Sequence, residues 1–498
     1  MLSTGAATFS TATALMARIL QPGRTCEAIA DSDASGVIVD ARDYYRSFYH
    51  TALAARRYLL LAGWQFDSDV PLLRGADRAE ATHPVELLPF LRSLCSERSD
   101  LVVYMLAWDY SLLYALEREW MQRLKFDWMT TDRIHFTFDD AHAVGASHHQ
   151  KFVVIDGSLA FAGGIDLCES RWDTREHVVD QPERVDRLGK PSKPYHDCMG
   201  YWTGPAAAEL ERLFCKRWNE SGAAPIELPT APHAPLPIPE PAIRLECRSV
   251  AYSLTRGPYL EREGVAQIRE LYEAAIRSAE TLIYIESQYF TSRAVHRALA
   301  ERMKGPGPKL EIVIVTPRGA DSPKEKLVLG DAQSWVLSSL CAIARDSGHA
   351  LRVLYSAARS ERGEEVSTFI HSKILCVDDR LLSVGSANCT NRSMSLDTEL
   401  ALVWECTDDA QPLKKSIARV RASLLCEHAG VPYAADFERT RGLVEHIDKL
   451  IGTSKLRAHD VPDSPDDLDQ DPLLERAFDP EAPLTALELG TLLERRHD

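Results

Sequence analysis

Short apolar runs and longer amphipathic stretches alternate along this chain of 498 residues. An apolar run of roughly four to eight residues is typical of a buried strand, and apolar residues recurring every three or four positions indicate a helix. The same order of elements occurs twice, which indicates an internal repeat. The runs predicted as strands are 58–64, 101–106 and 134–138, then 281–286, 310–315 and 351–355, with helices predicted at 84–97 and 264–279. This alternation predicts α/β layers in each half.

A proline-rich stretch separates the two halves. Pro225 to Pro241 contains seven prolines in seventeen residues, and proline breaks both helices and central strands. We therefore interpret it as an extended connector. The predicted boundaries are an N-terminal extension at 1–34, a first lobe at 35–222, a linker at 223–243, a second lobe at 244–455 and an acidic tail at 456–498. The tail has few apolar anchors, so we predict that it is partly disordered and dispensable for chemistry.

The net charge of −16 is unevenly distributed along the chain. Residues 460–498 hold twelve acidic residues and three arginines, so this segment carries −9 and the remainder of the chain −7. Binding to nucleic acid depends mainly on Lys and Arg side chains that neutralise phosphates. The negative net charge therefore disfavours a nucleic-acid partner. A local basic patch could still bind nucleic acid in a chain of this net charge.

The cysteines and the apolar segments indicate in which cellular compartment the protein is expected. Eleven cysteines without a CxxC pair are typical of free thiols in a reducing compartment rather than of a disulfide framework. The sequence shows neither a secretory signal nor the roughly 18 apolar residues that a transmembrane helix requires. We therefore expect a cytoplasmic protein that would meet a lipid substrate as a peripheral protein at the membrane surface.

Two segments carry the most specific chemical signal in the sequence. Residues 149–156 read HQKFVVID and residues 371–378 read HSKILCVD, so both follow the pattern His-x-Lys-x4-Asp around an apolar strand. Side chains two positions apart on a strand share a face, so His149 should lie beside Lys151 and His371 beside Lys373. One such match arises by chance in about one chain in twenty of this length. Two matches at corresponding places of a repeat are far less probable by chance.

The residues that follow each segment also correspond. Gly163 and Gly164 begin seven positions after Asp156, and Gly385 and Ser386 begin seven positions after Asp378. We expect Gly164 to let the backbone approach a phosphate closely. We expect Ser386, together with Asn388 two residues later, to donate hydrogen bonds to phosphate oxygens.

The duplicated segments resemble the HKD motifs of the phospholipase D superfamily, and the resemblance covers roughly residues 35–430. It is closest to bacterial phospholipase D-like proteins. Ser287 stands where asparagine is more usual in this family. Further matching segments are YIESQYF at 284–290, GIDL at 164–167, RWDT at 171–174, YHD at 195–197, NRS at 391–393 and DTE at 397–399.

The resemblance implies a fold and a reaction. The fold would be two homologous α/β/α sandwich lobes related by pseudo-twofold symmetry, with the active site at the lobe interface. The reaction would be cleavage of the distal phosphodiester of a glycerophospholipid through a phosphohistidine, giving phosphatidic acid and an alcohol. Its partners would be a phospholipid membrane surface and, as acceptor, water or a primary alcohol. No carboxylate–histidine cluster has zinc spacing, so we expect no metal and no cofactor.

The resemblance and the chemistry together assign roles to individual residues. By resemblance, His149 is the nucleophile, and His371 is the general acid and then the base that activates water. A neutral imidazole can attack phosphorus, a protonated one can supply the leaving alcohol with a proton, and the two lysines stabilise phosphoryl charge. Asp156 and Asp378 should hold local structure.

Each imidazole also needs an acidic partner on its other nitrogen. Alignment of the halves predicts that Asp197 orients His149 and that Glu399 orients His371. The longer path to Asp197 runs through 170–195, which we predict to be a surface loop at the mouth of the site. Glu286 and Gln288 are candidates for substrate binding from a strand end.

Three alternatives stay open from the sequence alone. A phosphatidyl transferase of the cardiolipin synthase type would use the same covalent intermediate, but the absence of predicted transmembrane helices counts against it. A nuclease is disfavoured by the negative charge. An inactive lipid-binding module is disfavoured by the complete set of His, Lys, Asn and Glu residues. Product analysis with mixed phospholipids, with and without a primary alcohol, would separate these functions.

Overall fold

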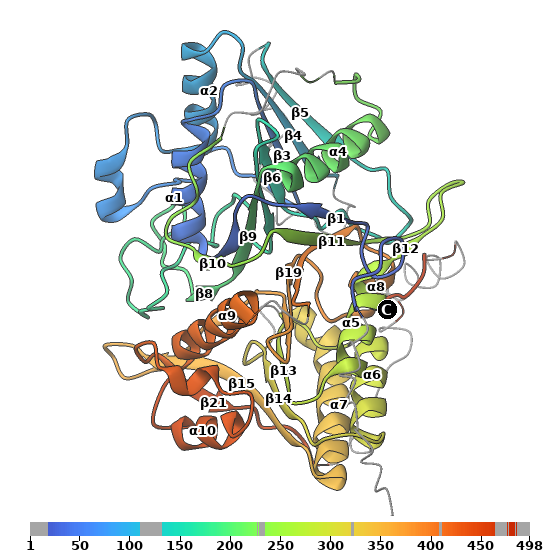
Figure 1. Ribbon diagram of the computed structural model, residues 1–498. Helices are drawn as coiled ribbons and strands as arrows, with labels where there is room; N and C mark the ends of the chain where they lie inside the picture. The colour runs from blue at the N-terminus through green and yellow to red at the C-terminus, as the bar shows by residue number, and fades with distance from the viewer. Residues whose placement is uncertain are drawn as a thin grey trace, which may run out of the picture.

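The chain folds into two α/β lobes that share a long interface (Figure 1). The computed structural model describes residues 18–109, 132–226, 228, 235–319, 323–407, 411–463, 476, 478–483 and 485. No helix in these described segments is both long and apolar enough to cross a bilayer.

The first lobe is built on an eight-stranded sheet in the order β10-β2-β9-β7-β6-β3-β4-β5. Helices α1 (Ala41–Ala52) and α2 (Leu87–Glu97) pack on one face of the sheet, and α4 (Pro205–Glu220) packs on the other. The strands are β2 (Ser35–Val39), β3 (Tyr58–Gly63), β4 (Val102–Trp108), β5 (Ile134–Asp139), β6 (Phe152–Ile155), β7 (Leu159–Gly163), β9 (Cys198–Thr203) and β10 (Ile243–Leu245).

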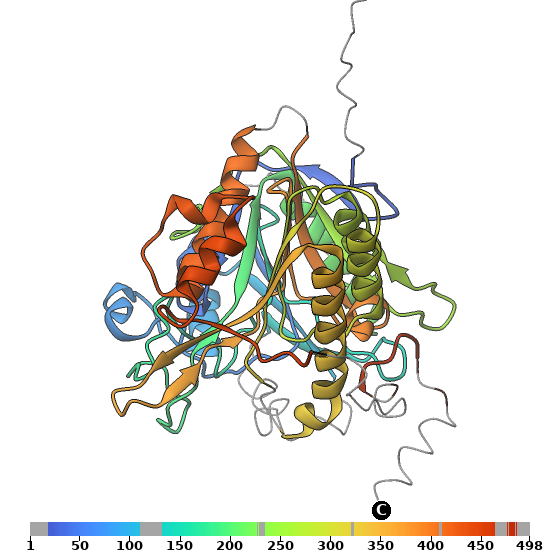
Figure 2. The ribbon, with the colours of Figure 1, turned by 90° about the horizontal axis from the view of Figure 1, so that it is seen from below.

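The second lobe is built on an eleven-stranded sheet in the order β1-β11-β20-β19-β18-β13-β14-β15-β16, with β12 added to β11 and β21 to β15. Figure 2 shows helices on both sides of these strands. The strands are β1 (Ala28–Asp31), β11 (Ser249–Arg256), β12 (Val265–Ala266), β13 (Leu282–Glu286), β14 (Glu311–Val315), β15 (Ala350–Arg359), β16 (Glu365–Ser367), β18 (Ile374–Val377), β19 (Leu381–Gly385), β20 (Glu399–Glu405) and β21 (Leu456–Ala458). The helices are α5 (Gln267–Ser278), α6 (Arg293–Lys304), α7 (Pro323–Ser347), α8 (Asn391–Ser395), α9 (Gln411–Ala429) and α10 (Leu443–Leu450).

The two sheets repeat the same strand order, which confirms the internal repeat. The strand order β9-β7-β6-β3-β4-β5 of the first sheet corresponds to β20-β19-β18-β13-β14-β15 of the second. In both sets of six strands, the last three pair in parallel with one another and the other neighbours are antiparallel. The parallel strands β3, β13 and β14 are buried on both faces, and this is why they read as continuous apolar runs.

The lobes share one apolar core. The inner faces of both sheets, together with α4 and α9, form a single cluster of buried side chains. Trp202 and Trp404 lie five residues after Asp197 and Glu399, so they occupy equivalent positions in the two lobes. Their rings meet across the interface with centroids 6.4 Å apart and planes at 82°. Equivalent tryptophans of the two lobes therefore pack against each other at the interface, as pseudo-twofold symmetry predicts.

The lobes also exchange strands at one edge of each sheet. β1, from the predicted N-terminal extension, pairs antiparallel with β11 of the second sheet. β10, at the end of the proline-rich connector, pairs antiparallel with β2 of the first sheet. The predicted boundaries at 34 and 243 therefore do not separate the lobes, because edge strands pair with the other half.

The start of the acidic tail is part of the fold, which corrects the predicted boundary at 455. β21 pairs with β15 at Leu456 and Arg457. Further along, Asp479 is only 2% exposed and accepts hydrogen bonds from Thr291 and from the backbone of α8. The tail is therefore anchored to the second lobe at two places.

Candidate active site

The two His-Lys pairs meet where the lobes face each other. His149 and Lys151 come directly before β6, and His371 and Lys373 come directly before β18. Lys151 donates to the backbone oxygen of His149 at 3.1 Å, and Lys373 makes the equivalent bond to the oxygen of His371. The site thus brings together the four residues that the repeated pattern predicted.

Each histidine of the two motifs is held by a carboxylate from the opposite lobe. Nδ1 of His149 lies 3.1 Å from both carboxylate oxygens of Glu399. Nδ1 of His371 lies 2.6 Å from Oδ2 of Asp197. With Nδ1 occupied, Nε2 is the nitrogen of each ring that can react with a substrate.

This arrangement corrects the pairing predicted from the sequence, in which each acid served the histidine of its own half. The cause is backbone pairing between the lobes. The N–H of His149 donates to Thr398 at 2.8 Å, next to Glu399, and the N–H of His371 donates to His196 at 2.8 Å, next to Asp197. Two short strands, β8 (Tyr195–His196) and β17 (Phe369–Ile370), pair in parallel to make the second of these contacts.

Two of the residues expected to contact phosphate lie against the two carboxylates. A methyl group at Gly164 would overlap the carboxylate of Asp197, so glycine is required there for a close approach. Ser386, at the equivalent place, donates its hydroxyl to Oε2 of Glu399 at 2.5 Å. Gly164 and Ser386 therefore position the two carboxylates, and their contact with phosphate stays a prediction.

The aspartates of the two motifs lie away from the reacting atoms. Asp156 accepts hydrogen bonds from the backbone N–H groups of 56–58, and Asp378 accepts the equivalent bonds from 280–282. Both have positive φ angles, 49° and 55°. Each carboxylate thereby holds the start of β3 or β13 against its motif strand.

The two lysines differ in their neighbours. Lys151 forms an ion pair with Asp166 at 3.2 Å, whereas the second half has Asn388 at the equivalent position. The side-chain oxygen of Asn388 is buried and has no hydrogen-bond partner among the residues that the structure describes. Burial lowers the pKa of Lys373 to about 7, and the nearby charge of Lys151 contributes to this shift.

The environment of His371 disfavours its charged form. Burial, followed by the positive charges of Lys373 and Arg171, holds the pKa of His371 well below its ordinary value. Burial also raises the pKa of its partner Asp197 to about 6. A bound phosphodiester would add a negative charge and so raise the pKa of His371 again.

Aromatic side chains line both sides of the site. The Trp64 ring lies 6.4 Å from the His149 ring and 5.8 Å from the ring of Trp108, with which it stacks. On the other side, the Tyr195 ring lies 5.4 Å from the His371 ring. These rings give the two histidines apolar surroundings that raise the strength of electrostatic interactions.

Glu286 does not reach the site, which corrects the prediction that it binds substrate. Its side chain is fully buried and is shared by His196, His428 and the hydroxyls of Tyr284 and Ser372. Ser372 lies between His371 and Lys373 in the chain, so its side chain points to the opposite face. Gln288 donates to the Tyr289 hydroxyl at 2.8 Å, and the structure records no contact between Gln288 and either described histidine of the site.

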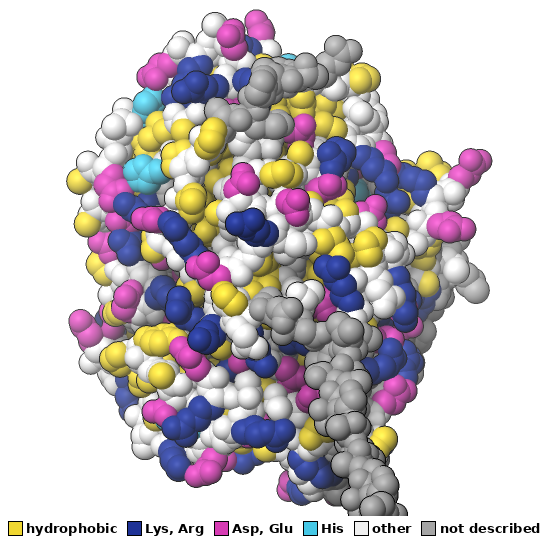
Figure 3. All heavy atoms as spheres, viewed as in Figure 1, with side chains coloured by type: hydrophobic (Ala, Val, Ile, Leu, Met, Phe, Trp, Pro, Cys, Tyr) yellow, Lys and Arg dark blue, Asp and Glu magenta, His cyan; other side chains and the backbone are white. Residues whose placement is uncertain are grey.

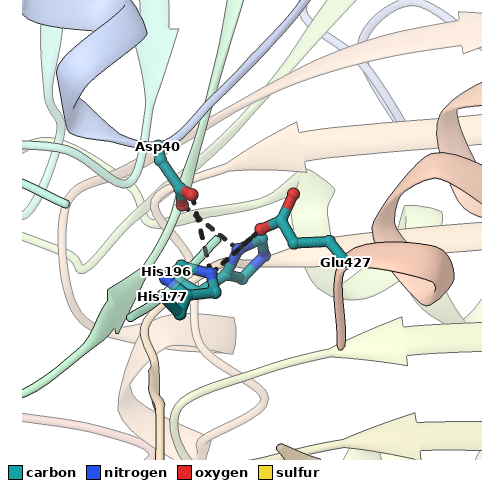
Figure 4. A group of neighbouring side chains, drawn as sticks. All are labelled: Asp40, His177, His196 and Glu427. Carbon is teal, nitrogen blue, oxygen red and sulfur yellow. Dashed lines mark hydrogen bonds and ion pairs between the residues drawn. The ribbon is translucent and has the colours of Figure 1, made fainter. Parts of the chain in front are cut away.

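The segment 170–195 is not the simple surface loop that its polarity predicted. Asp173, His177 and Arg184 are buried within it, and Arg184 binds Asp173 at 2.7 Å. His177 meets Asp40, His196 and Glu427 in a buried group whose ligand atoms all lie within 4.8 Å of one another (Figure 4). This group was not predicted from the sequence, because its members lie far apart along the chain.

Two features of the buried group would suit a divalent cation. The distances between imidazole nitrogens and carboxylate oxygens range from 2.6 Å, for Nδ1 of His196 and Glu427, to 3.6 Å, for Nε2 of His177 and Asp40. The remaining nitrogens bind carboxylates, His177 to Asp173 at 3.0 Å and His196 to Glu286 at 3.0 Å, as metal-ligating histidines usually do.

Protonated histidines can also balance the negative charge of the carboxylates in this group. Burial lowers the pKa of His177, but Asp40 and Asp173 outweigh this effect and raise the pKa to about 9. The residues of this group could therefore hold either a cation or protonated imidazoles, since metal and protons compete for the same nitrogens.

Family models match both halves of the chain. A model described as "Phospholipase D" matches residues 51–235, and one described as "Cardiolipin synthase, PLD-like domain" matches residues 272–421.

Several phospholipases D are similar in sequence. Phospholipase D alpha 4 of Arabidopsis thaliana is 24% identical, with 82% of this chain and 66% of the relative covered. Phospholipase D alpha 1 of Carica papaya is 24% identical, covering 86% and 70%. Phospholipase D A of Dictyostelium discoideum is 25% identical, covering 73% and 32%. The chain thus spans about two thirds of the length of the plant relatives and a third of the Dictyostelium protein.

A solved structure shares the two-lobe arrangement. The phosphatidylserine synthase of Haemophilus influenzae Rd KW20 superimposes with a TM-score of 0.55 at 14% identity, covering 84% of this chain and 94% of the other. This likeness concerns the fold. Taken with the family matches in both halves and the paired His-Lys motifs, it leads to one conclusion: the chain belongs to the phospholipase D superfamily.

Proposed function

We propose that the protein is a phospholipase D-type phosphodiesterase that cleaves the distal phosphodiester of a glycerophospholipid. One observation carries the proposal. Two imidazoles from different lobes each have Nδ1 fixed by a buried carboxylate, with a lysine beside each. This arrangement supplies a nucleophile, a proton donor and positive charge at one place, as phosphodiester cleavage requires.

In the first step, Nε2 of His149 attacks phosphorus and a P–N bond forms. The bond from phosphorus to the headgroup oxygen breaks, and Nε2–H of His371 gives that oxygen its proton. In the second step, His371 takes a proton from water as the water oxygen attacks phosphorus. The P–N bond then breaks, which releases phosphatidic acid and regenerates both imidazoles. A primary alcohol in place of water would give phosphatidyl transfer through the same intermediate.

The proposed partner is a phospholipid surface that the protein meets from outside. Positive and negative side chains are interspersed over the face seen in Figure 3, without a broad basic area that would favour a nucleic-acid backbone there.

Product analysis tests the proposed function. The protein is incubated with a mixture of short-chain phospholipids, with and without ethanol, and the products are identified by mass spectrometry. We expect phosphatidic acid in water and a share of phosphatidylethanol when ethanol is present. Diacylglycerol, or no reaction with any phospholipid, would contradict the proposal.

Covalent trapping tests the role of each histidine. In the His371→Ala variant, rapid quenching with a nitrophenyl phosphodiester should leave on His149 a phosphoryl group that keeps its other ester bond, because nitrophenolate departs without a proton. His149→Ala should form no adduct and stay inactive on this substrate. An adduct found only on His371, in the His149→Ala variant, would reverse the two roles.

A further inference from the structure

Arg171 differs from the other arginines of its loop. Four arginines lie between residues 171 and 187. Arg175, Arg184 and Arg187 each bind a carboxylate, at 2.6 to 2.7 Å. Arg171 forms no hydrogen bond or ion pair with any residue that the structure describes, and its Nε is buried without a partner. Burial lowers the pKa of Arg171, but neighbouring groups that include Asp166 outweigh this effect and keep the guanidinium charged. A buried charge without a hydrogen-bonded partner is costly, so the missing ion pair calls for an explanation.

The Arg171 guanidinium lies at the wall of the active site. It packs over the Tyr195 ring with Cζ 5.2 Å from the ring centroid, and the same ring lies 5.4 Å from that of His371. The Tyr195 hydroxyl is also buried and has no hydrogen-bond partner among the described residues. Two unpartnered polar groups therefore lie side by side near His371.

The charge of Arg171 reaches the catalytic groups. It contributes to the lowered pKa of both His371 and Lys373. A planar guanidinium offers parallel N–H donors that match carboxylate and phosphate oxygens. The ring of Tyr195 fixes the plane of the guanidinium, so less side-chain entropy is lost when an anion binds.

We propose that Arg171 is a substrate-binding residue that takes an oxyanion on the His371 side of the site. This inference rests on the proposed function, in which His371 protonates the departing headgroup and therefore faces it. The oxyanion has two possible sources, a carboxylate of the headgroup or a non-bridging oxygen of the phosphodiester. In the first case Arg171 selects phospholipids with a carboxylate headgroup; in the second it adds a third cation to the two lysines.

Two lipids that differ by one carboxylate separate these sources. Short-chain phosphatidylserine and phosphatidylethanolamine are compared as substrates of the native chain and of Arg171→Gln. If Arg171 binds the headgroup carboxylate, kcat/KM should fall about 10- to 100-fold for phosphatidylserine alone, mainly through KM. If Arg171 binds the phosphoryl group, kcat/KM should fall equally for both lipids, mainly through a lower kcat. Unchanged kinetics for both lipids would overturn the proposal.

Matched variants control for folding. Arg171→Lys keeps the charge and should recover part of the loss. Arg187→Gln removes a partly exposed arginine of the same loop, which binds Glu169 at 2.7 Å, and should leave both substrates unaffected. Thermal unfolding of all three variants should show that the lobes stay folded.

Equilibrium binding gives a readout without turnover. In the His149→Ala background, the affinities of O-phosphoserine and phosphoethanolamine are measured by calorimetry. Arg171→Gln should weaken at least one of them by about tenfold, or about 1.4 kcal/mol. Equal affinities with and without Arg171 would overturn the inference. If the native chain hydrolyses neither lipid, the proposed function fails, and the binding measurement still decides the role of Arg171.

Discussion

Glu399 and Asp197 each contact a motif histidine across the lobe interface, at Nδ1 of a ring that belongs to the other half. Conversion of Glu399 to Gln or of Asp197 to Asn should lower turnover by about 10- to 100-fold, as the loss of an orienting carboxylate usually does. The two variants should differ in the step that they affect.

With a nitrophenyl phosphodiester, the Glu399→Gln variant should lose formation of the covalent intermediate, because Glu399 holds His149. Asp197→Asn should form the intermediate at close to the native rate, because nitrophenolate needs no proton from His371. Single-turnover release of nitrophenolate measures this step directly. The opposite result would show that each acid serves the histidine of its own half.

The lowered pKa of Lys373 predicts a pH dependence. A lysine with a pKa of about 7 is protonated at lower pH and loses its charge as the pH rises through this value. The phosphate would then lose one stabilising cation, so kcat/KM should fall as the pH rises above about 7. Lys373→Arg keeps its charge and should move the fall to higher pH. A flat profile between about pH 6 and 9 would contradict this.

The sequence identified the four residues of the His-Lys pairs, because their spacing is local and occurs twice. It did not identify which acid serves which histidine. That choice depends on backbone pairing of His149 with Thr398 and of His371 with His196. Contacts between distant segments leave no local pattern, and the same reason explains why the buried group around His177 was missed.

At the scale of elements, the parallel strands β3, β13 and β14 were predicted correctly because both of their faces are buried and their sequences are mostly apolar. The edge strands β1 and β10 were not predicted to pair with the opposite lobe. An edge strand is specified by its partner rather than by its own pattern. The anchoring of the tail was missed for a similar reason, since a single buried carboxylate in an acidic segment looks like its solvated neighbours.

The tail should be needed for stability, contrary to the expectation from its composition. Asp479 accepts hydrogen bonds from Thr291 and from the N–H groups of Asn391 and Arg392. Arg392 in turn binds Asp397, which accepts a bond from the backbone of Ser147, two residues before His149. Removal of the carboxylate leaves buried donors unpaired, and each costs about 1–3 kcal/mol.

The Asp479→Ala variant should therefore unfold at a lower temperature and show a reduced kcat/KM on a soluble phosphodiester. Asp463→Ala is the matched control, because the side chain of Asp463 in the same tail is 98% exposed. A chain ending at Lys455 should be affected more strongly, since it also lacks β21. Native stability and activity in all of these chains would restore the view that the tail is dispensable.

At the scale of the whole molecule, the buried group of Asp40, His177, His196 and Glu427 ties the first lobe to α9 of the second. We expect a chelator to leave the hydrolysis of a soluble short-chain phosphodiester unchanged, because the imidazoles and lysines already supply the chemistry. A cation that binds this group would raise the unfolding temperature instead. Activity and thermal unfolding are measured with a chelator and then with single divalent cations.

The Glu427→Gln variant locates any effect of cations. A cation that stabilises the native chain but not this variant binds at the buried group. Loss of hydrolysis in the chelator, restored by one cation in the native chain and not in the variant, would show that catalysis depends on this group. It would contradict our expectation that the chemistry needs no metal.

The crossed pairing of histidines and carboxylates has a consequence for the ancestry of the chain. A single lobe contains an imidazole and an acid, but the acid is placed to serve a neighbour. A protein with only one such lobe would complete its sites by forming a symmetric homodimer, in which the same surface of each subunit supplies what the other lacks. Duplication and fusion of that gene would keep the interface and free each copy to diverge. Here the divergence can be seen at one pair of equivalent positions: Asp166 forms an ion pair with Lys151 in the first half, and the second half has Asn388 at that position.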